Sequence, residues 1–165
     1  MQAETISSSV PFEYKPFCFY RADEIPKHFC KQVEVAVKDF VESSRQVNID
    51  KKGLFYQTLE SIANMTVLEG SGDFWMLTCG EELLGYVLAR IVKDVDNSLT
   101  YWISQAWVRK DYRGNSIVKA SWKEIRERAK NCFCKHIVIV SSRHAKAYER
   151  FLGVHKYCDL LKEDL

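Results

Sequence analysis

The spacing of apolar residues predicts a chain that begins with one strand and two helices. Residues 17–22 form a short aromatic run that favours a strand. The following apolar side chains recur three or four residues apart and predict a helix over 25–41. Its expected core face consists of Phe29, Val33, Val37 and Phe40. After a polar loop, a second helix is expected over 54–67, with an inner face of Leu54, Leu59, Ile62, Ala63 and Val67.

Three consecutive strands follow in the middle of the chain. Runs rich in apolar residues predict strands over 74–79, 83–92 and 99–108, joined by short turns. The turns make neighbouring strands antiparallel. Gly85 stands inside the second run, where it indicates a bulge or a close approach of another backbone.

The last third of the chain returns to helices and strands in alternation. A helix from about Asn115 carries an apolar stripe of Val118, Trp122, Ile125 and Ala129. Its other face is interpreted as a solvated mixture of charges that includes a Glu124–Arg128 pair. A strand over 135–140, a helix over 143–152 and a final strand over 154–161 complete the pattern.

Composition predicts one globular domain over 17–165, preceded by a polar arm over 1–16. The chain has 165 residues, of which 47% are hydrophobic and 28% charged, with a net charge of +2. This mild charge argues against nucleic-acid binding. The sequence has neither a membrane-length apolar run nor a signal peptide, so we expect a protein of the cytoplasm, or of a particle assembled there. Polar arms are commonly ordered by a neighbour, which predicts a protein partner or a homo-oligomer at the arm.

The six cysteines are expected to be free thiols rather than a disulfide framework. Their dense cluster, Cys132 to His136, lacks the spacing of a structural zinc site, so no metal is expected.

The region from Leu99 to Lys130 carries the most specific chemistry in the sequence. A strand leads through a tight basic loop containing Arg113 and Gly114 into an amphipathic helix. Such a turn directs backbone N–H groups and the positive end of the helix dipole toward one point. The segment therefore predicts a phosphate-binding site, although an exposed basic turn would have the same composition.

The order of elements and four local motifs resemble the GNAT superfamily of N-acetyltransferases. The motifs are YRADEIP (20–26), GEELLGYV (80–87), VRKDYRGNSIV (108–118) and AYERFLGV (147–154). The resemblance implies an α/β (α+β) fold with a central mixed, mostly antiparallel sheet flanked by about four helices. It also implies transfer of an acetyl group from acetyl-CoA to a primary amine.

The resemblance also implies roles for particular residues. Trp107 and Val108 would face the pantetheine arm of acetyl-CoA, and Tyr148 would protonate the departing thiolate, although it could also simply pack as an aromatic residue. The residues implied for the pyrophosphate are Arg113, Gly114, Asn115, Ser116, Ile117 and Val118.

The sequence departs from the family pattern at three positions of the loop. Ser116 and Val118 replace the two small residues of the motif, and Lys110 replaces its usual proline. The strand over 99–108 holds no Asp or Glu that could act as general base, and a lone His144 is more commonly structural.

Two functions therefore remain open at the level of sequence. One is an N-acetyltransferase. The alternative is a catalytically inactive GNAT-fold structural or interaction protein, for example an internal component of a phage particle.

Overall fold

A computed structural model describes residues 17–44, 50–68, 70, 72–114 and 116–140. The elements in chain order are β1 (Phe17–Arg21), α1 (Lys27–Ser43), α2 (Lys51–Val67), β2 (Asp73–Cys79), β3 (Glu82–Lys93), β4 (Leu99–Val108), the 3₁₀ turn η1 (Lys110–Tyr112), α3 (Ser116–Asn131) and β5 (His136–Ile139). Every expected strand and helix in these ranges is present, with ends that differ by three residues or fewer.

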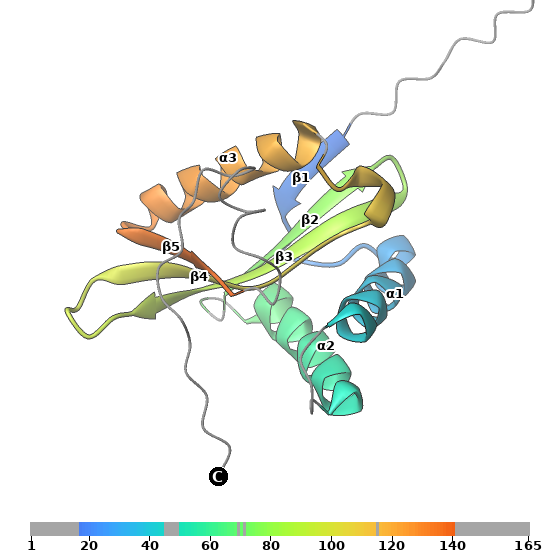
Figure 1. Cartoon of the computed structure of the whole chain (residues 1–165), viewed down its shortest axis with the longest axis horizontal. Coiled ribbons are helices and arrows are strands. Elements are labelled where there is room, and N and C mark those ends of the chain that lie inside the picture. Colours follow the sequence, from blue (N-terminus) through green and yellow to red (C-terminus); the bar gives the residue numbers. More distant parts are fainter. Residues whose placement is uncertain (1–16, 45–49, 69, 71, 115, 141–165) are drawn as a thin grey trace, which may run out of the picture.

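The strands form one sheet in the order β1-β2-β3-β4-β5 (Figure 1). The first three pairings are antiparallel, whereas β4 and β5 run parallel. Parallel neighbours need a crossover, and α3 provides it. The expected mixed, mostly antiparallel sheet with flanking helices is thus confirmed.

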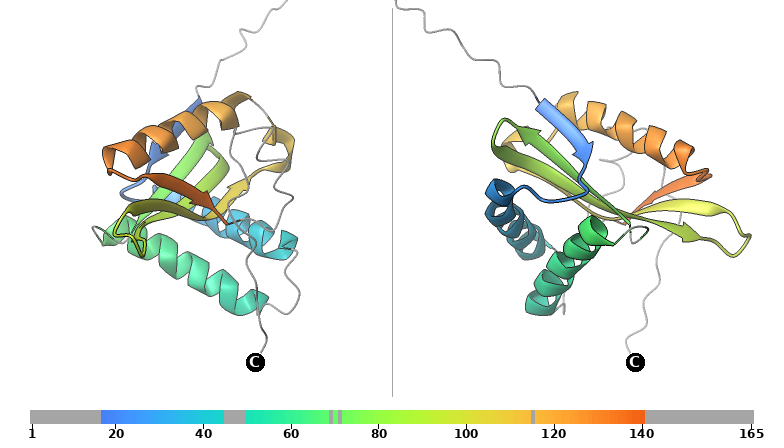
Figure 2. Two further views of the ribbon diagram at one scale, coloured as in Figure 1. Left: turned by 60° about the vertical axis from the view of Figure 1, so that its left-hand side comes forward. Right: turned by 180° about the vertical axis from the view of Figure 1, so that it is seen from behind.

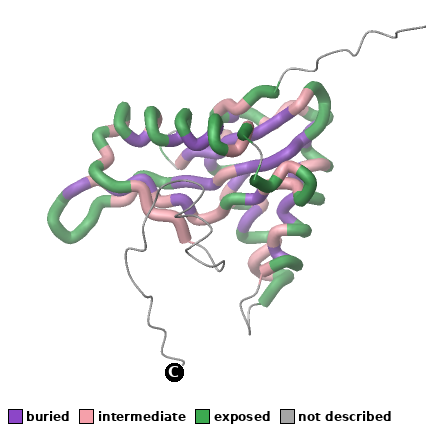
Figure 3. The backbone as a smooth tube through the Cα atoms, turned by 45° about the horizontal axis from the view of Figure 1, so that its top comes forward, coloured by how far each residue is buried: buried purple, intermediate pink, exposed green. Residues whose placement is uncertain are grey.

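Helices α1 and α2 cover one face of the sheet, and α3 covers the other (Figure 2). One core joins α1 and α2 to β2 and β3, and the aromatic residues Phe74 and Tyr86 are buried in it. A second core lies between the sheet and α3, around Tyr101, Trp122 and Ile125. The buried backbone in Figure 3 accordingly follows the inner strands and the inner sides of the helices.

Helix α1 packs as its sequence pattern predicted. Phe29, Val33 and Val37 are buried, and the half-buried Phe40 packs against the same core. Pro26 directly precedes the helix, where its missing N–H costs nothing, and its carbonyl accepts a hydrogen bond from the Phe29 N–H at 2.8 Å.

The predicted inner face of α2 was partly wrong. Ile62 is buried, but Ala63 is exposed and Val67 is 79% exposed. Thr58 and Met65 are buried instead. Thr58 can face inward because its hydroxyl accepts a hydrogen bond from the Gln105 amide of β4 at 2.8 Å. Because Thr58 is polar, the spacing of apolar residues alone did not predict that it belongs to the buried face of α2.

The solvated face predicted for α3 was wrong at Arg128. Its guanidinium donates two hydrogen bonds to Asp73, at 2.9 and 3.1 Å, instead of pairing with Glu124. The Asp73 carboxylate is only 5% exposed and also accepts from the Tyr101 hydroxyl and from Arg21. Burial alone would raise the pKa of Asp73, but the bonds from Arg128, Tyr101 and Arg21 outweigh it and lower the pKa.

The expected arm over 1–16, the helix over 143–152 and the strand over 154–161 lie outside the described residues. In the part of the chain that is described, no helix combines the length and apolar character needed to cross a membrane.

Candidate active site

A β-bulge divides β4 into two halves. Leu88 pairs with Gln105 and Ala89 pairs with Ile103, so Ser104 is the extra residue on β4. The Ser104 hydroxyl donates a hydrogen bond to the Leu88 carbonyl at 3.3 Å, which holds the bulge against β3. An extra residue breaks the alternation of faces, and both Ser104 and Gln105 consequently line the side of the sheet covered by α2.

The partner strand β5 stays with the first half of β4 only. Its register runs from Thr100 opposite His136 to Ile103 opposite Ile139, and the Val140 N–H then bonds the Ile103 carbonyl at 3.0 Å. Among the described residues, nothing pairs with the outer edge of β4 over 104–108. The described part of β5 therefore pairs with β4 only up to Ile103, directly before the bulge. The edge of β4 over 104–108 that faces away from β3, with which no described residue pairs, is the open edge of β4.

The second half of β4 presents defined backbone groups at this open edge. The Arg109 N–H bonds the Leu84 carbonyl at 2.8 Å, so the alternation of an antiparallel ladder turns the peptide groups of Trp107 toward β3. The groups of Ala106 and Val108 then face the open edge. Arg113 occupies one of them, because its Nε bonds the Val108 carbonyl at 2.8 Å.

The loop after β4 is fixed to the rest of the molecule at several points. Tyr112 contacts the ring of Phe17 edge-on and lies beneath the Arg109 guanidinium, 4.7 Å from the ring centroid. Arg109 also bonds Asp111 at 2.9 Å and Glu82 at 3.2 Å, so its charge is compensated. In the described part of the loop, Lys110 and Arg113 are the cations that form no ion pair.

The loop ends in an accessible turn at the start of α3. Gly114 adopts φ = +80°, a conformation that residues with a side chain rarely adopt. Apart from its chain neighbours, no atom of the described residues lies within 4 Å of where its Cβ would be. Ser116 is exposed, whereas Ile117 and Val118 are half-buried. No acidic residue occupies the first turn of α3. The first turn of α3, with its backbone N–H groups and the positive end of the helix dipole, is therefore exposed and directly follows a loop that carries Lys110 and Arg113.

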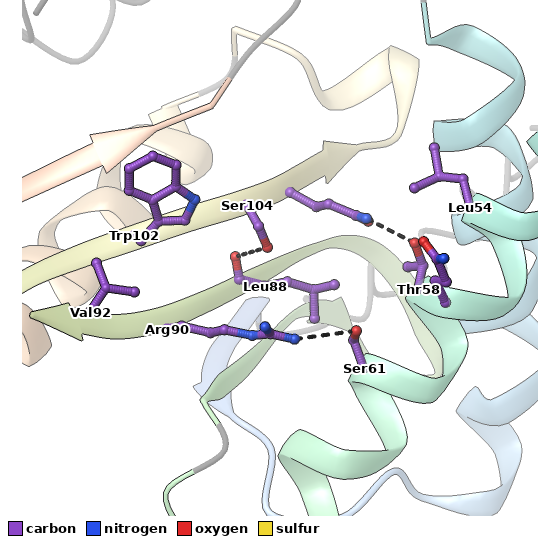
Figure 4. A pocket seen from close by; sticks show the side chains of 10 residues that line it. Leu54, Thr58, Ser61, Leu88, Arg90, Val92, Trp102 and Ser104 are labelled. Atoms are coloured by element: carbon purple, nitrogen blue, oxygen red, sulfur yellow. Dashed lines mark hydrogen bonds between the residues drawn. The ribbon is translucent and has the colours of Figure 1, made fainter. Parts of the chain in front are cut away.

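A cavity of about 440 Å³ lies on the other face of the sheet, between α2 and the strands β3 and β4. The side chains around it are mostly neutral (Figure 4). They are Leu54, Gln57, Thr58, Ser61, Leu88, Arg90, Val92, Trp102, Ser104 and Gln105. Because Ser104 lines the cavity and is also the bulged residue at which the open edge of β4 begins, the cavity adjoins this edge.

Hydrogen bonds fix the wall of the cavity formed by β4. The Gln105 amide accepts from the Tyr86 hydroxyl at 3.2 Å and donates to Thr58 at 2.8 Å. Burial, with a smaller contribution from Asp39, raises the pKa of Tyr86, which therefore remains a hydrogen-bond donor at neutral pH. Nearby, the Trp107 indole donates to Asp39 of α1 at 2.5 Å.

The structure brings together most of the residues expected at the site. Val108, Arg113, Gly114, Ser116, Ile117 and Val118 follow one another at the open edge and in the loop. The Trp107 side chain points to α1, so this residue adjoins the edge through its backbone. Asn115, His144 and Tyr148 lie outside the described residues. No group of His, Cys, Asp or Glu in the described segments could hold a metal ion.

Sequence reasoning missed the bulge, Ala106 and the Asp39 contact. The adjacent polar pair Ser104 and Gln105 interrupts the alternation of the strand and could have indicated the bulge. Nothing in the sequence relates Asp39 to Trp107.

The model of the GNAT acetyltransferase family matches residues 37–154, well over half of the chain. The chain belongs to this family. A comparison with curated proteins gave no match.

Solved structures of GNAT proteins share the fold. A putative acetyltransferase from Pyrococcus furiosus is 19% identical with a TM-score of 0.68, over 91% of this chain and 100% of the other. A predicted acetyltransferase from Clostridium acetobutylicum, solved with acetyl-CoA, is 14% identical with a TM-score of 0.62, over 90% and 96%. An aminoglycoside N-acetyltransferase in complex with CoA is 11% identical with a TM-score of 0.68, over 92% and 95%. At these identities the likeness concerns the fold alone.

The GNAT family generally uses acetyl-CoA, and the residues present fit this donor. An extended pantetheine arm needs backbone hydrogen-bonding groups at a strand edge, and those of Ala106 and the Val108 N–H face the open edge, whereas the Val108 carbonyl is bonded by Arg113. A pyrophosphate needs N–H groups, positive charge and close access, which the loop around Gly114 provides. Val118 is half-buried, so part of its side chain packs against the protein and does not fill the space beside Gly114.

Proposed function

We propose that the protein transfers an acetyl group from acetyl-CoA to a primary amine. The observation that carries the proposal is the bulge at Ser104, which begins the open edge of β4 directly before the basic loop and α3. This arrangement places a strand edge that no described residue pairs with next to a helix start suited to an anion, and one short chain segment joins the two. A module with a purely structural role would need neither.

Each half of the site has its own task in this reaction. The N–H and carbonyl groups of Ala106 and the N–H of Val108 would hold the donor in an extended conformation. Lys110, Arg113 and the first turn of α3 would bind its phosphates. Acetyl-CoA supplies the acetyl thioester when bound. Catalysis then rests mainly on positioning the amine against it.

The reaction forms a C–N bond, breaks a C–S bond and moves one proton. The amine must lose a proton, and the CoA sulfur must gain one. The family resemblance gives the second step to Tyr148. For the first step, Asp39 is the candidate acceptor, since it is a carboxylate held by a side chain from this half of β4, the Trp107 indole.

A second candidate function is a binding module that has lost acetyl transfer. Ser116 and Val118, which replace the small residues of the family loop, favour it. The two functions differ in whether CoA is released, not in fold.

The test incubates the full chain with acetyl-CoA and a panel of primary amines, while released CoA thiol and acetylated amine are measured together. The enzyme proposal expects both products in equal amounts. An absence of both, across the panel and with acetyl-CoA at millimolar concentration, supports the binding module.

Asp39→Asn keeps an oxygen for the Trp107 bond but removes the base, so we expect turnover to fall at least about 10-fold at neutral pH. Glu42→Gln is the matched control, an equivalent change on an exposed side chain of the same helix. Equal rates in both variants would exclude Asp39 as the base.

A further inference from the structure

We propose that the cavity between α2 and the β3–β4 strands receives the acceptor, and that it selects amines that also carry an acidic group. The inference rests on the proposed function for the reaction, but the choice of acceptor follows from the chemistry of this cavity.

The cavity is placed to present an amine at the open edge. Ser104 belongs both to its wall and to the bulge at which the open edge of β4 begins. Donor and acceptor would therefore approach this point from different sides, with the donor along the strand edge and the acceptor from the face beneath α2.

Arg90 is the one charged side chain among the described residues that line the cavity. Its guanidinium has a single long hydrogen bond, 3.4 Å to the Ser61 hydroxyl, and forms no ion pair within the described residues. Arg21, Arg109 and Arg128, in contrast, each pair with a carboxylate. Arg90 therefore keeps its capacity for a bidentate bond to a carboxylate or phosphate.

The remaining lining is suited to a neutral chain between amine and acid. Leu54, Leu88, Val92 and Trp102 supply apolar surface, and Gln57, Ser61 and Gln105 supply neutral polar groups. No described lining residue is acidic, so a second positive charge on the acceptor would meet Arg90 without compensation.

The register of the strands gives the spacing of the two groups on the acceptor. Arg90 lies opposite Trp102, two residues before Ser104 on β4. Two residues of a strand span roughly 7 Å, so the acid would lie several bonds from the reacting amine.

The test compares three amines with the same five-carbon chain. These are 5-aminopentanoate with an acid, pentylamine with a neutral end, and 1,5-diaminopentane with a second cation. We expect kcat/KM for the acid to exceed that for pentylamine by about 10- to 100-fold, because a charge-assisted bond is gained. A fourth arm, 3-aminopropyl phosphate, distinguishes a phosphate from a carboxylate as the preferred acid.

Two variants locate the preference. Arg90→Gln should reduce it to less than about 3-fold, mainly through KM, whereas Arg90→Lys should retain a part of it. Arg126→Gln, which removes an exposed arginine from α3 on the opposite face of the sheet, should leave it unchanged. Equal or better use of pentylamine or 1,5-diaminopentane overturns the inference, as does an Arg90→Gln variant with the preference intact.

A binding measurement separates this inference from the proposed reaction. Calorimetry compares 5-acetamidopentanoate with N-pentylacetamide, the corresponding products, in the absence of turnover. Preference for the acid that Arg90→Gln abolishes supports the acceptor site even if no acetyl transfer is found. Binding of neither compound, or equal binding of both, refutes it.

Discussion

Gly85 lies on β3, opposite the end of β4. Replacing it by alanine should displace that end of β4. A Cβ at this position would lie 2.9 Å from the Trp107 carbonyl oxygen, 3.4 Å from Val108 Cγ2 and 3.6 Å from Leu77 Cβ. The first of these separations is shorter than real Cβ contacts, and the atom in the way is backbone. Strand β4 must therefore move by a few tenths of an ångström where it enters the proposed donor site.

The cost of this movement can be bounded. One extra methyl group in a well-packed region costs about 1–3 kcal/mol, and the reduced freedom of the unfolded chain returns about 0.4–1 kcal/mol. The net loss of unfolding free energy should be about 1–2 kcal/mol. For a chain of this size it corresponds to a fall in Tm of roughly 2–8 °C.

The same shift should weaken acetyl-CoA binding, since Val108 carries backbone groups of the open edge. Impairing one hydrogen bond predicts a Kd higher by about 3- to 10-fold. Thermal unfolding followed by circular dichroism and calorimetric titration with acetyl-CoA measure the two effects.

Gly53→Ala is the matched control. Its Cβ would meet the Asp50 side chain, a flexible group that can move away, and alanine is about 0.5–1 kcal/mol better than glycine inside a helix. This variant should be at least as stable as the original and bind acetyl-CoA equally well. A Gly85→Ala variant with unchanged Tm and Kd, or an equal loss in Gly53→Ala, would refute the reasoning.

Three further predictions concern the buried ion pair and Tyr148, the proposed general acid. Arg128→Met should lower the unfolding free energy, measured by urea titration, by about 3–5 kcal/mol, since it leaves the buried Asp73 carboxylate without its bidentate partner. Arg21→Met removes a partly exposed arginine that makes one bond to Asp73, and it should cost less than half as much. The pKa of Asp73 is lower in the folded chain than in the unfolded chain, where it is near 3.9. The carboxylate therefore stabilises the fold fully at a pH above about 3.9, and this contribution is lost as the pH falls through the pKa of the folded state. The Asp73→Asn variant should accordingly be less stable than the original protein at pH 7, and its stability should fall less steeply below about pH 4. Parallel curves of unfolding free energy against pH for the variant and the original protein would contradict this. Tyr148→Phe should lower turnover about 100-fold without changing acetyl-CoA affinity, and Tyr56→Phe, at an exposed site on α2, should change neither.

Local patterns were sufficient to predict the order and the approximate ends of the described elements. The strands are marked by runs of apolar residues and α1 by helical spacing, because most of their buried positions are apolar. The prediction from local patterns was wrong for part of the inner face of α2 and for Arg128 of α3. In both places a polar side chain turns inward to a partner far away in the sequence, Gln105 for Thr58 and Asp73 for Arg128.

The loop could be located from sequence, whereas the edge and the cavity could not. Arg113 and Gly114 are adjacent in the chain and form a local motif. The open edge depends on the bulge and on the register in which β5 pairs with β4, and the cavity depends on how α2 lies across two strands. Both are relations between segments 30 to 50 residues apart, which no local pattern encodes.

The central claim is that the open edge of β4, with the loop that follows it, binds acetyl-CoA. The most direct test is the thermal midpoint of the full chain at increasing acetyl-CoA concentration. A ligand at 100 times its Kd stabilises by about 2.7 kcal/mol, so the midpoint should rise by roughly 5–11 °C, and by clearly less in Arg113→Ala. No rise at millimolar acetyl-CoA would contradict the claim.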